Sequence, residues 1–188
     1  PAKLRQIEAY GARLVRIAGA RSEVSAAAQA AAERGAAYAS HAWQPINLAG
    51  QATTAFEVWE QLGRRAPDVI VTPVGQGTLL LGLYWGWGAL WQGGQIDRLP
   101  RLIGAQPEAC APLVTSSSPT GLTTVADGAR IASPVRRRQI LAAVQASRGT
   151  LVAIPDHETL RAREQLARAG VYVEPTSALA VAALTHFE

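Results

Sequence analysis

The residues most suited to binding a ligand form a short glycine loop, Gly75-Gln76-Gly77-Thr78, which follows a run of β-branched residues. Glycine lets the backbone turn tightly and approach a ligand closely. The first N–H groups of a following helix lack partners inside the helix, and the helix dipole favours an anion there. The Thr78 hydroxyl is a further donor. The loop is therefore predicted to bind phosphate, and the alternative is a structural turn without a ligand.

Two nucleotide-binding motifs fit this loop less well. A dinucleotide-binding fingerprint needs a third glycine where this chain has Leu80. Asp97 stands about 20 residues further on, the usual distance for a ribose ligand, but no clean strand ends there. A P-loop is excluded because no Gly-Lys-Ser/Thr sequence follows the glycines. A Rossmann-type NAD-binding domain therefore stays open as an alternative.

Strands and helices that alternate along the chain must position the loop. Short apolar runs predict buried strands at residues 14–17, 69–71, 102–103, 151–154 and 171–173. Helices are predicted over residues 3–10, 22–32, 48–62, 79–91, 134–147 and 156–169, with a further helix from residue 175. We expect Pro134 in the first turn of its helix and Asp156 as a cap of the next.

This order of elements predicts an α/β fold in three layers, with a mostly parallel, twisted sheet and helices on both faces. Such sheets bind ligands beyond the carboxyl ends of their strands. The loops after Val74, Gln106 and Val173 are therefore the expected location of a site.

Composition narrows the class of protein. The chain has 188 residues, of which 48% are hydrophobic and 17% charged, so one domain with a buried core is expected. A net charge of +4, spread along the chain, does not indicate nucleic-acid binding, and no apolar run is long enough to cross a membrane. Cys110 is the only cysteine, which fits a reducing compartment, and no His or Cys cluster predicts a metal site.

Several motifs, taken together and in order, resemble one enzyme family. They are Gly50-Gln51-Ala52-Thr53-Thr54-Ala55-Phe56-Glu57, residues 67–77 around the glycine loop, Gly104-Ala105-Gln106-Pro107-Glu108, Ala126-Asp127-Gly128-Ala129, and Glu174-Pro175-Thr176-Ser177-Ala178. The chain is similar along nearly its whole length to the threonine synthase-like members of the fold-type-II pyridoxal-phosphate enzymes. Threonine dehydratase, cysteine synthase and the tryptophan synthase β chain belong to the same superfamily.

The resemblance implies which residues contact the cofactor. In the family, the glycine loop gives backbone amides to the phosphate of pyridoxal 5'-phosphate, which falls here on Gly75, Gln76, Gly77 and Thr78. The family usually has glycine or asparagine at position 76, but an amide contact tolerates Gln76. Glu174 becomes a candidate for a polar contact near the cofactor ring.

The resemblance also implies that parts of the enzyme lie outside this sequence. The family lysine that forms the Schiff base stands upstream, in a Ser-x-Lys setting, whereas Lys3 is the only lysine here and matches a non-catalytic helix. The loop that holds the substrate carboxylate and the strand that pairs with the pyridine nitrogen are also missing. We therefore expect residues 1–40 to be part of the smaller domain and residues 41–188 to be the phosphate-binding large domain, truncated at its C-terminal end. No catalytic residue is assigned.

The expected parent activity is that of threonine synthase, which converts O-phosphohomoserine to threonine and phosphate. A threonine or serine dehydratase or a cysteine synthase-like enzyme is the alternative within the family. A non-catalytic ligand-binding domain is an alternative from another class. We further expect an amino-acid substrate, a homodimer and a cytoplasmic location, without nucleic-acid or membrane partners.

Other notable residues are interpreted as structural. Four tryptophans at near-helical spacing indicate core or interface packing, namely Trp59, Trp85, Trp87 and Trp91. The arginine run at residues 136–138 is expected to be a solvated helix face. Cys110 is expected to pack rather than react, and the Ser/Thr/Pro segment at residues 115–120 is expected to be mobile.

Overall fold

The computed structural model describes residues 2–19, 21–115 and 123–187. The chain divides into two compact units, Pro1–Ser40 and His41–Glu188. The first unit contains α1 (Ala2–Ala9) and α2 (Arg21–Glu33). The strand expected at residues 14–17 does not form, and Val15 is 63% exposed. A short apolar run becomes a strand only where a neighbouring strand supplies hydrogen bonds, and this unit has none in its described part.

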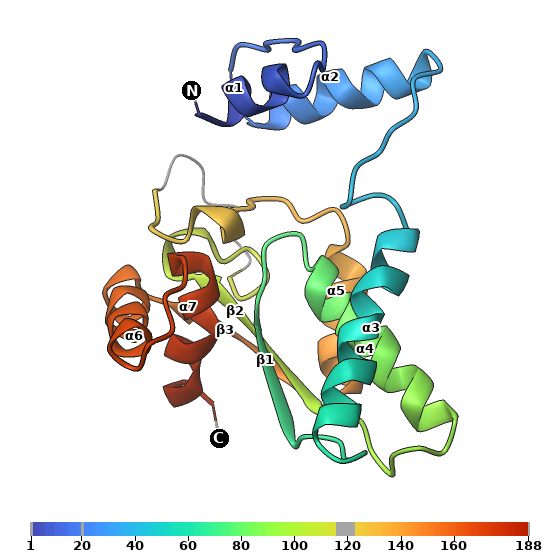
Figure 1. Ribbon diagram of the computed structural model, residues 1–188, viewed down its shortest axis with the longest axis vertical. Coiled ribbons are helices and arrows are strands. Elements are labelled where there is room, and N and C mark those ends of the chain that lie inside the picture. The colour runs from blue at the N-terminus through green and yellow to red at the C-terminus, as the bar shows by residue number, and fades with distance from the viewer. Residues whose placement is uncertain (1, 20, 116–122, 188) are drawn as a thin grey trace. The chain divides into compact units, whose positions relative to one another are not determined.

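The second unit is built on a parallel sheet (Figure 1). Its strands are β1 (Val69–Pro73), β2 (Arg101–Pro107) and β3 (Thr150–Ile154), paired in that order. Pro73 is opposite Ala105, and Pro107 is opposite Ile154. The three strands therefore end at one edge of the sheet, where the predicted site should lie.

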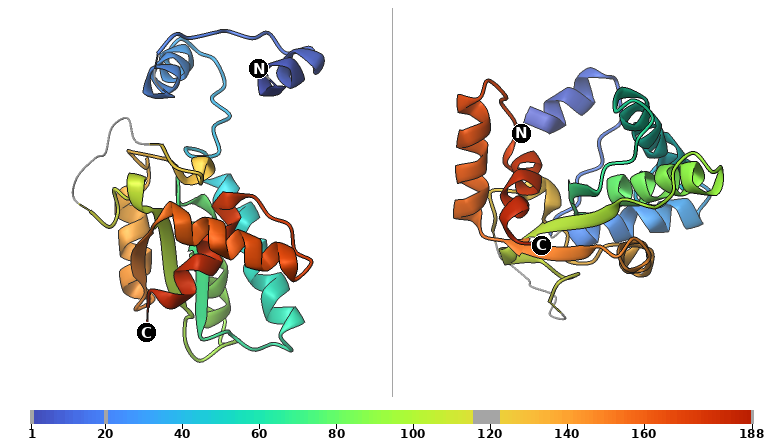
Figure 2. Two further views of the ribbon diagram at one scale, coloured as in Figure 1. Left: turned by 90° about the vertical axis from the view of Figure 1, so that its left-hand side faces the viewer. Right: turned by 90° about the horizontal axis from the view of Figure 1, so that it is seen from below.

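Helices cover both faces of this sheet, as Figures 1 and 2 show. On one face lie α4 (Thr78–Gln92) and α5 (Arg137–Ala146), with α3 (Ile46–Gln61) packed along α4. On the other face lie α6 (Asp156–Arg168) and α7 (Pro175–Ala182). The predicted three-layer α/β architecture is confirmed, although α5 begins at Arg137, so Pro134 precedes the helix rather than occupying its first turn.

The two faces have separate hydrophobic cores because side chains alternate along each strand. Leu102 joins the cluster of α4 and α5, which includes Leu80 and Ile140. The adjacent Ile103 joins the cluster of α6 and α7, which includes Leu179. The sheet is thus buried on both sides, which explains its continuous apolar strands.

Two further expectations in this unit are wrong. Residues 171–173 do not form a strand, and Tyr172 is 86% exposed, because this segment runs between two helices without pairing with a described strand. Asp156 is the first residue of α6 rather than its cap, a position that Pro155 occupies. The segment expected to be mobile falls, apart from Thr115, outside the described residues.

The tryptophans divide between core and surface. Trp87 is fully buried in α4 and packs with Leu83 and Ala55. Trp85 and Trp91, on the same helix, are 46% and 50% exposed, and Trp59 is partly buried. Among the described helices, none is both long and apolar enough to span a membrane.

Candidate functional site

The glycine loop joins β1 to α4 at the carboxyl edge of the sheet. The Val74 N–H donates to the carbonyl of Ala105 (2.8 Å), which extends the pairing of β1 and β2 by one residue. Gly77 then takes a left-handed conformation, with φ of 76°, and its carbonyl accepts the N–H of Leu81 (2.9 Å). This conformation favours glycine, so the sequence at 77 fixes the point where α4 begins.

The loop offers several unused donors. Within the described part of the chain, no backbone hydrogen bond joins the N–H groups of Gly75, Gln76 or Gly77 to a carbonyl. The Thr78 hydroxyl oxygen is buried and has no partner among the described residues. Unpaired donors at a helix N-terminus suit an anion, because the helix dipole adds a favourable field.

A second segment packs directly against the loop. It contains a short 3₁₀ helix, η2 (Asp127–Ala129). A Cβ atom placed on Gly75 would lie 3.1 Å from the Gly128 carbonyl oxygen and 3.1 Å from Cγ1 of Ile131. The close approach leaves little room for a side chain at position 75, and η2 forms one wall beside the loop.

The start of α7 holds this wall. The Gly128 N–H donates to the Thr176 hydroxyl (3.2 Å), and a Cβ on Gly128 would lie 2.8 Å from that oxygen. Three motifs that are far apart in the sequence therefore meet at one place. We call residues 75–78, residues 124–131 and Thr176 together the glycine-loop site.

The Gln76 side chain forms a hydrogen bond with another segment of the protein. Its Oε1 accepts the N–H of Val135 (3.1 Å), in the segment before α5. Glycine at this position lacks such a group. Gln76 thus links the loop to the segment before α5 through a side-chain oxygen that glycine would not provide, while its backbone amide stays available.

Gln106 connects two loops from beneath the site. Its side chain is completely buried, its amide donates to the Val74 carbonyl (3.1 Å), and its Oε1 accepts the Leu113 N–H (2.9 Å). Sequence reasoning identified the loop after Gln106 but missed this role. The available signal was a polar amide at the end of an otherwise apolar strand, where burial demands hydrogen-bond partners.

Arg137 and Arg138 of the arginine run are exposed, as expected for a solvated helix face, but two of the three side chains also hold loops. Arg136 donates to the carbonyls of Ala42 (3.0 Å) and Trp43 (2.8 Å), and Arg137 donates to the Pro112 carbonyl. Both side chains satisfy backbone acceptors in loops, which a charge pattern in the sequence alone does not reveal.

Glu174 and Cys110 complete the expected residues. Glu174 is the exposed N-cap residue of α7, two residues before Thr176. Among the described residues, its carboxylate forms no capping hydrogen bond with the first N–H groups of that helix. Cys110 is buried in η1 (Glu108–Cys110). Burial raises the pKa of the Cys110 thiol, although the Arg130 guanidinium opposes this, so the uncharged thiol fits the packing role expected for it.

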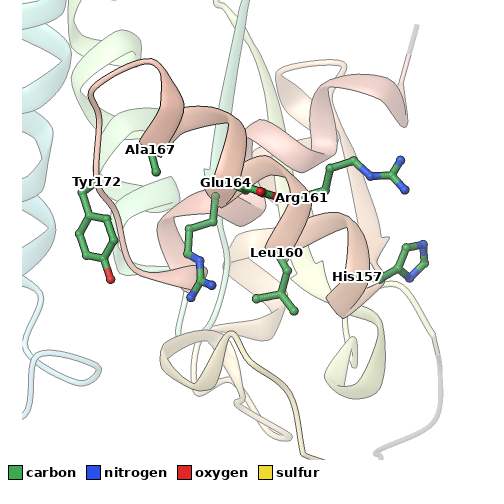
Figure 3. Close-up of a pocket in the computed structure, with 7 residues that line it drawn as sticks. His157, Leu160, Arg161, Glu164, Ala167 and Tyr172 are labelled. Atoms are coloured by element: carbon green, nitrogen blue, oxygen red, sulfur yellow. The ribbon is translucent and has the colours of Figure 1, made fainter.

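A separate hollow lies on the outer face of α6 (Figure 3). Its volume is about 600 Å³, and we call it the α6 hollow. It is lined by His157, Leu160, Arg161, Arg163, Glu164, Ala167 and Tyr172. It shares no residue with the glycine-loop site, and all its lining residues except Tyr172 come from one helix.

Comparison with known proteins decides the family. A family profile described as pyridoxal-phosphate dependent enzyme matches residues 1–188. The chain belongs to the pyridoxal-phosphate-dependent enzymes. The cofactor of this family is pyridoxal phosphate.

Relatives within this family include threonine synthases. The chain is 36% identical over 184 residues to that of Mycobacterium bovis and 34% identical over 191 residues to that of Methanosarcina acetivorans. Each match covers 97% of this chain, but only 51% and 47% of the relatives. The chain thus spans about half the length of these relatives.

Two solved structures resemble the fold of this chain. A threonine deaminase from T.th. is 29% identical with a TM-score of 0.77, and the match covers 99% of this chain and 61% of that one. A maize serine racemase is 19% identical with a TM-score of 0.78, covering 97% and 54%. The second likeness supports the fold only.

Proposed function

We propose that residues 75–78 bind the phosphate group of pyridoxal phosphate. The observation that carries this proposal is the close approach of Gly75 to η2, combined with unpaired amides on the glycine loop. A side chain at position 75 would fill the space beside the loop. The buried Thr78 hydroxyl, which has no partner among the described residues, suits a fourth phosphate donor. The residues present therefore fit the group that the family carries.

The chain's own residues have a limited set of tasks in this proposal. When bound, pyridoxal phosphate serves as an electron sink that stabilises negative charge on a substrate carbon. The amides of Gly75, Gln76 and Gly77 hold its phosphate and thereby orient the ring. Glu174 is proposed to make a polar contact near the ring. Lys3 lies in α1, in the other compact unit, and has no assigned part in the chemistry.

For the whole protein we propose the reaction of threonine synthase, from O-phosphohomoserine to threonine and phosphate. The identity of 31–36% to six threonine synthases, over 97% of this chain, supports this choice. The second candidate is a threonine or serine dehydratase, favoured by the structural likeness to threonine deaminase at 29% identity. Assaying the enzyme that contains this chain with O-phosphohomoserine and with threonine separates the two candidate functions. A threonine synthase releases phosphate from O-phosphohomoserine, whereas a dehydratase acts on threonine and releases no phosphate.

Phosphate binding can be tested on the 188-residue chain itself. We suggest following backbone amide signals by NMR while adding pyridoxal phosphate, inorganic phosphate or pyridoxal, which lacks the phosphate. The first two should shift the signals of Gly75 and Gly77, and pyridoxal should not. Saturating phosphate that shifts only residues of the α6 hollow, such as Arg163, would overturn the proposal.

We also propose that residues 1–40 belong to the smaller domain of the enzyme and residues 41–188 to its large domain. The separation of the chain into two compact units at residue 40 supports this division. A homodimer and a cytoplasmic location are proposed on the family resemblance. Sedimentation of the whole enzyme and its fractionation from cells test the two statements.

A further inference from the structure

Asp156 lies outside the glycine-loop site, yet its carboxylate contacts the segment that forms the site's wall. It is the first residue of α6 and follows β3. Its Oδ1 accepts the Thr124 hydroxyl (2.6 Å), and its Oδ2 accepts the Val125 N–H (3.0 Å). Both oxygens of the carboxylate are therefore engaged by the segment before η2.

These contacts continue into η2. The Thr124 hydroxyl oxygen accepts the Ala126 N–H (3.1 Å), and the Ala126 carbonyl accepts the Ala129 N–H (2.9 Å). The wall is thus fixed at its start by Asp156 and at Gly128 by Thr176. At the second of these points, the Gly128 carbonyl and the neighbouring Ala129 Cα face the position of Gly75.

We propose that Asp156 is a positioning residue for the cofactor-binding site. It holds residues 124–126 so that η2 stays against the glycine loop and the loop keeps its amides in the geometry that phosphate requires. This inference rests on the proposed binding of phosphate by residues 75–78. Asp156 itself does not touch the cofactor, because it acts through Thr124 and η2.

The geometry favours this role over that of a simple helix carboxylate. An acidic residue in the first turn of a helix commonly stabilises the helix through its dipole. Glu158 occupies the same first turn, but its carboxylate contacts His186 (2.5 Å) and not the wall segment. The two carboxylates therefore offer a matched pair, one tied to the site and one not.

The test compares variants of the 188-residue chain by their affinity for pyridoxal phosphate and by hydrogen exchange of backbone amides. Asp156→Asn keeps the size of the side chain but replaces one of the two acceptor oxygens with an amide nitrogen, which cannot accept a hydrogen bond. We expect the Kd to rise about threefold to tenfold, the effect of one or two lost hydrogen bonds. Exchange at Ala126 and Gly128, whose N–H groups are hydrogen-bonded in the wall, should become faster, while the amides of β2 stay protected.

Two controls distinguish positioning from general destabilisation. Glu158→Gln removes a first-turn charge from the same helix and should leave the Kd and the exchange at Gly128 unchanged. Thr124→Val lacks the hydroxyl and should show the same rise in Kd as Asp156→Asn. Thr124→Ser keeps the hydroxyl and should bind pyridoxal phosphate as the parent chain does. This second pair decides the matter even if Asp156→Asn fails to fold.

The outcomes also separate this inference from the proposed function. If the parent chain binds pyridoxal phosphate at the glycine loop but Asp156→Asn and Thr124→Val bind it equally well, the positioning role is wrong and the phosphate site stands. If the parent chain shows no change at Gly75 or Gly77 on adding pyridoxal phosphate, both proposals fail.

Discussion

The glycine-loop site and the α6 hollow are built in opposite ways. The first joins three segments distant in sequence, and its donors are mostly backbone amides at the carboxyl edge of the sheet. The second is a shallow region on one helix, rich in charged side chains such as Arg161, Arg163 and Glu164. A fixed arrangement of amides is prepared before the ligand arrives, whereas flexible charged side chains on a surface must be ordered on binding. For this reason we place the proposed phosphate site where the three segments converge and not at the α6 hollow.

The largest expected effect comes from filling the space beside the loop. Gly75→Val places a branched side chain where a Cβ already lies 3.1 Å from the Gly128 carbonyl, so the loop or η2 must move. We expect no detectable binding of pyridoxal phosphate or inorganic phosphate by calorimetry. Arg163→Ala in the α6 hollow is the counterpart and should bind both as the parent does. If both variants lost binding equally, the phosphate site could not be assigned to the glycine loop rather than to the α6 hollow.

Next in size is the loss of the buried support beneath the loop. Gln106→Ala leaves the Val74 carbonyl and the Leu113 N–H without their partner, and each buried orphan costs about 1–3 kcal/mol. Urea unfolding should show that the free energy of unfolding falls by at least the cost of one such group, about 1–3 kcal/mol. Gln145→Ala, at an exposed position of α5, is the control and should change it little. A Gln106→Ala chain as stable as the parent contradicts the prediction.

A smaller effect is expected at the start of α4. Gly77→Ala puts an L side chain at φ of 76° and a Cβ 2.3 Å from Cδ1 of Ile140, at a cost of about 1–2 kcal/mol in backbone strain alone. Gly88→Ala, in the same helix with open space around it, should stabilise the chain by up to about 1 kcal/mol. Thermal unfolding of both variants measures the difference, and shifts of the same sign would show that the left-handed turn at 77 is not required.

The smallest effect concerns the acidic residue beside the α6 hollow. The hydrogen bond from His186 lowers the pKa of the Glu158 carboxyl, with a weaker opposing effect of burial. A lowered pKa adds stability above the unfolded-state value of about 4.3, and that stability is lost as the pH falls through the folded pKa. We expect Glu158→Gln to cost a few tenths of a kcal/mol at pH 6.

The measurement is urea unfolding of the parent and Glu158→Gln chains between pH 6 and pH 2.5. The gap between the two should close with acid because the parent carboxyl becomes protonated. A gap that stays constant to pH 2.5 contradicts the assigned cause. At any one pH the two chains should bind pyridoxal phosphate equally, because Glu158 does not belong to the glycine-loop site.

The sequence predicted the layers of the second unit and the position of the glycine loop, because both follow from local patterns. β-branched runs, helical periodicity and two glycines after residue 74 each act through neighbouring residues. The expected strand at 171–173 was wrong since its apolar pattern carries no information about a pairing partner. The contacts of Gln106 with Val74 and Leu113 were missed for a similar reason, as hydrogen bonds across loops depend on the assembled fold.

The order of the strands has a consequence for how the chain folds during its synthesis. β1, β2 and β3 pair in the order in which they leave the ribosome, so each new strand can join a preceding one without waiting for later sequence. The wall of the site is different, because Gly128 acquires its partner Thr176 only when α7 docks on β1 and β2. The three described strands can therefore be paired while the wall beside the glycine loop still lacks its second anchor, so under the proposed function we expect cofactor binding to follow the docking of α7.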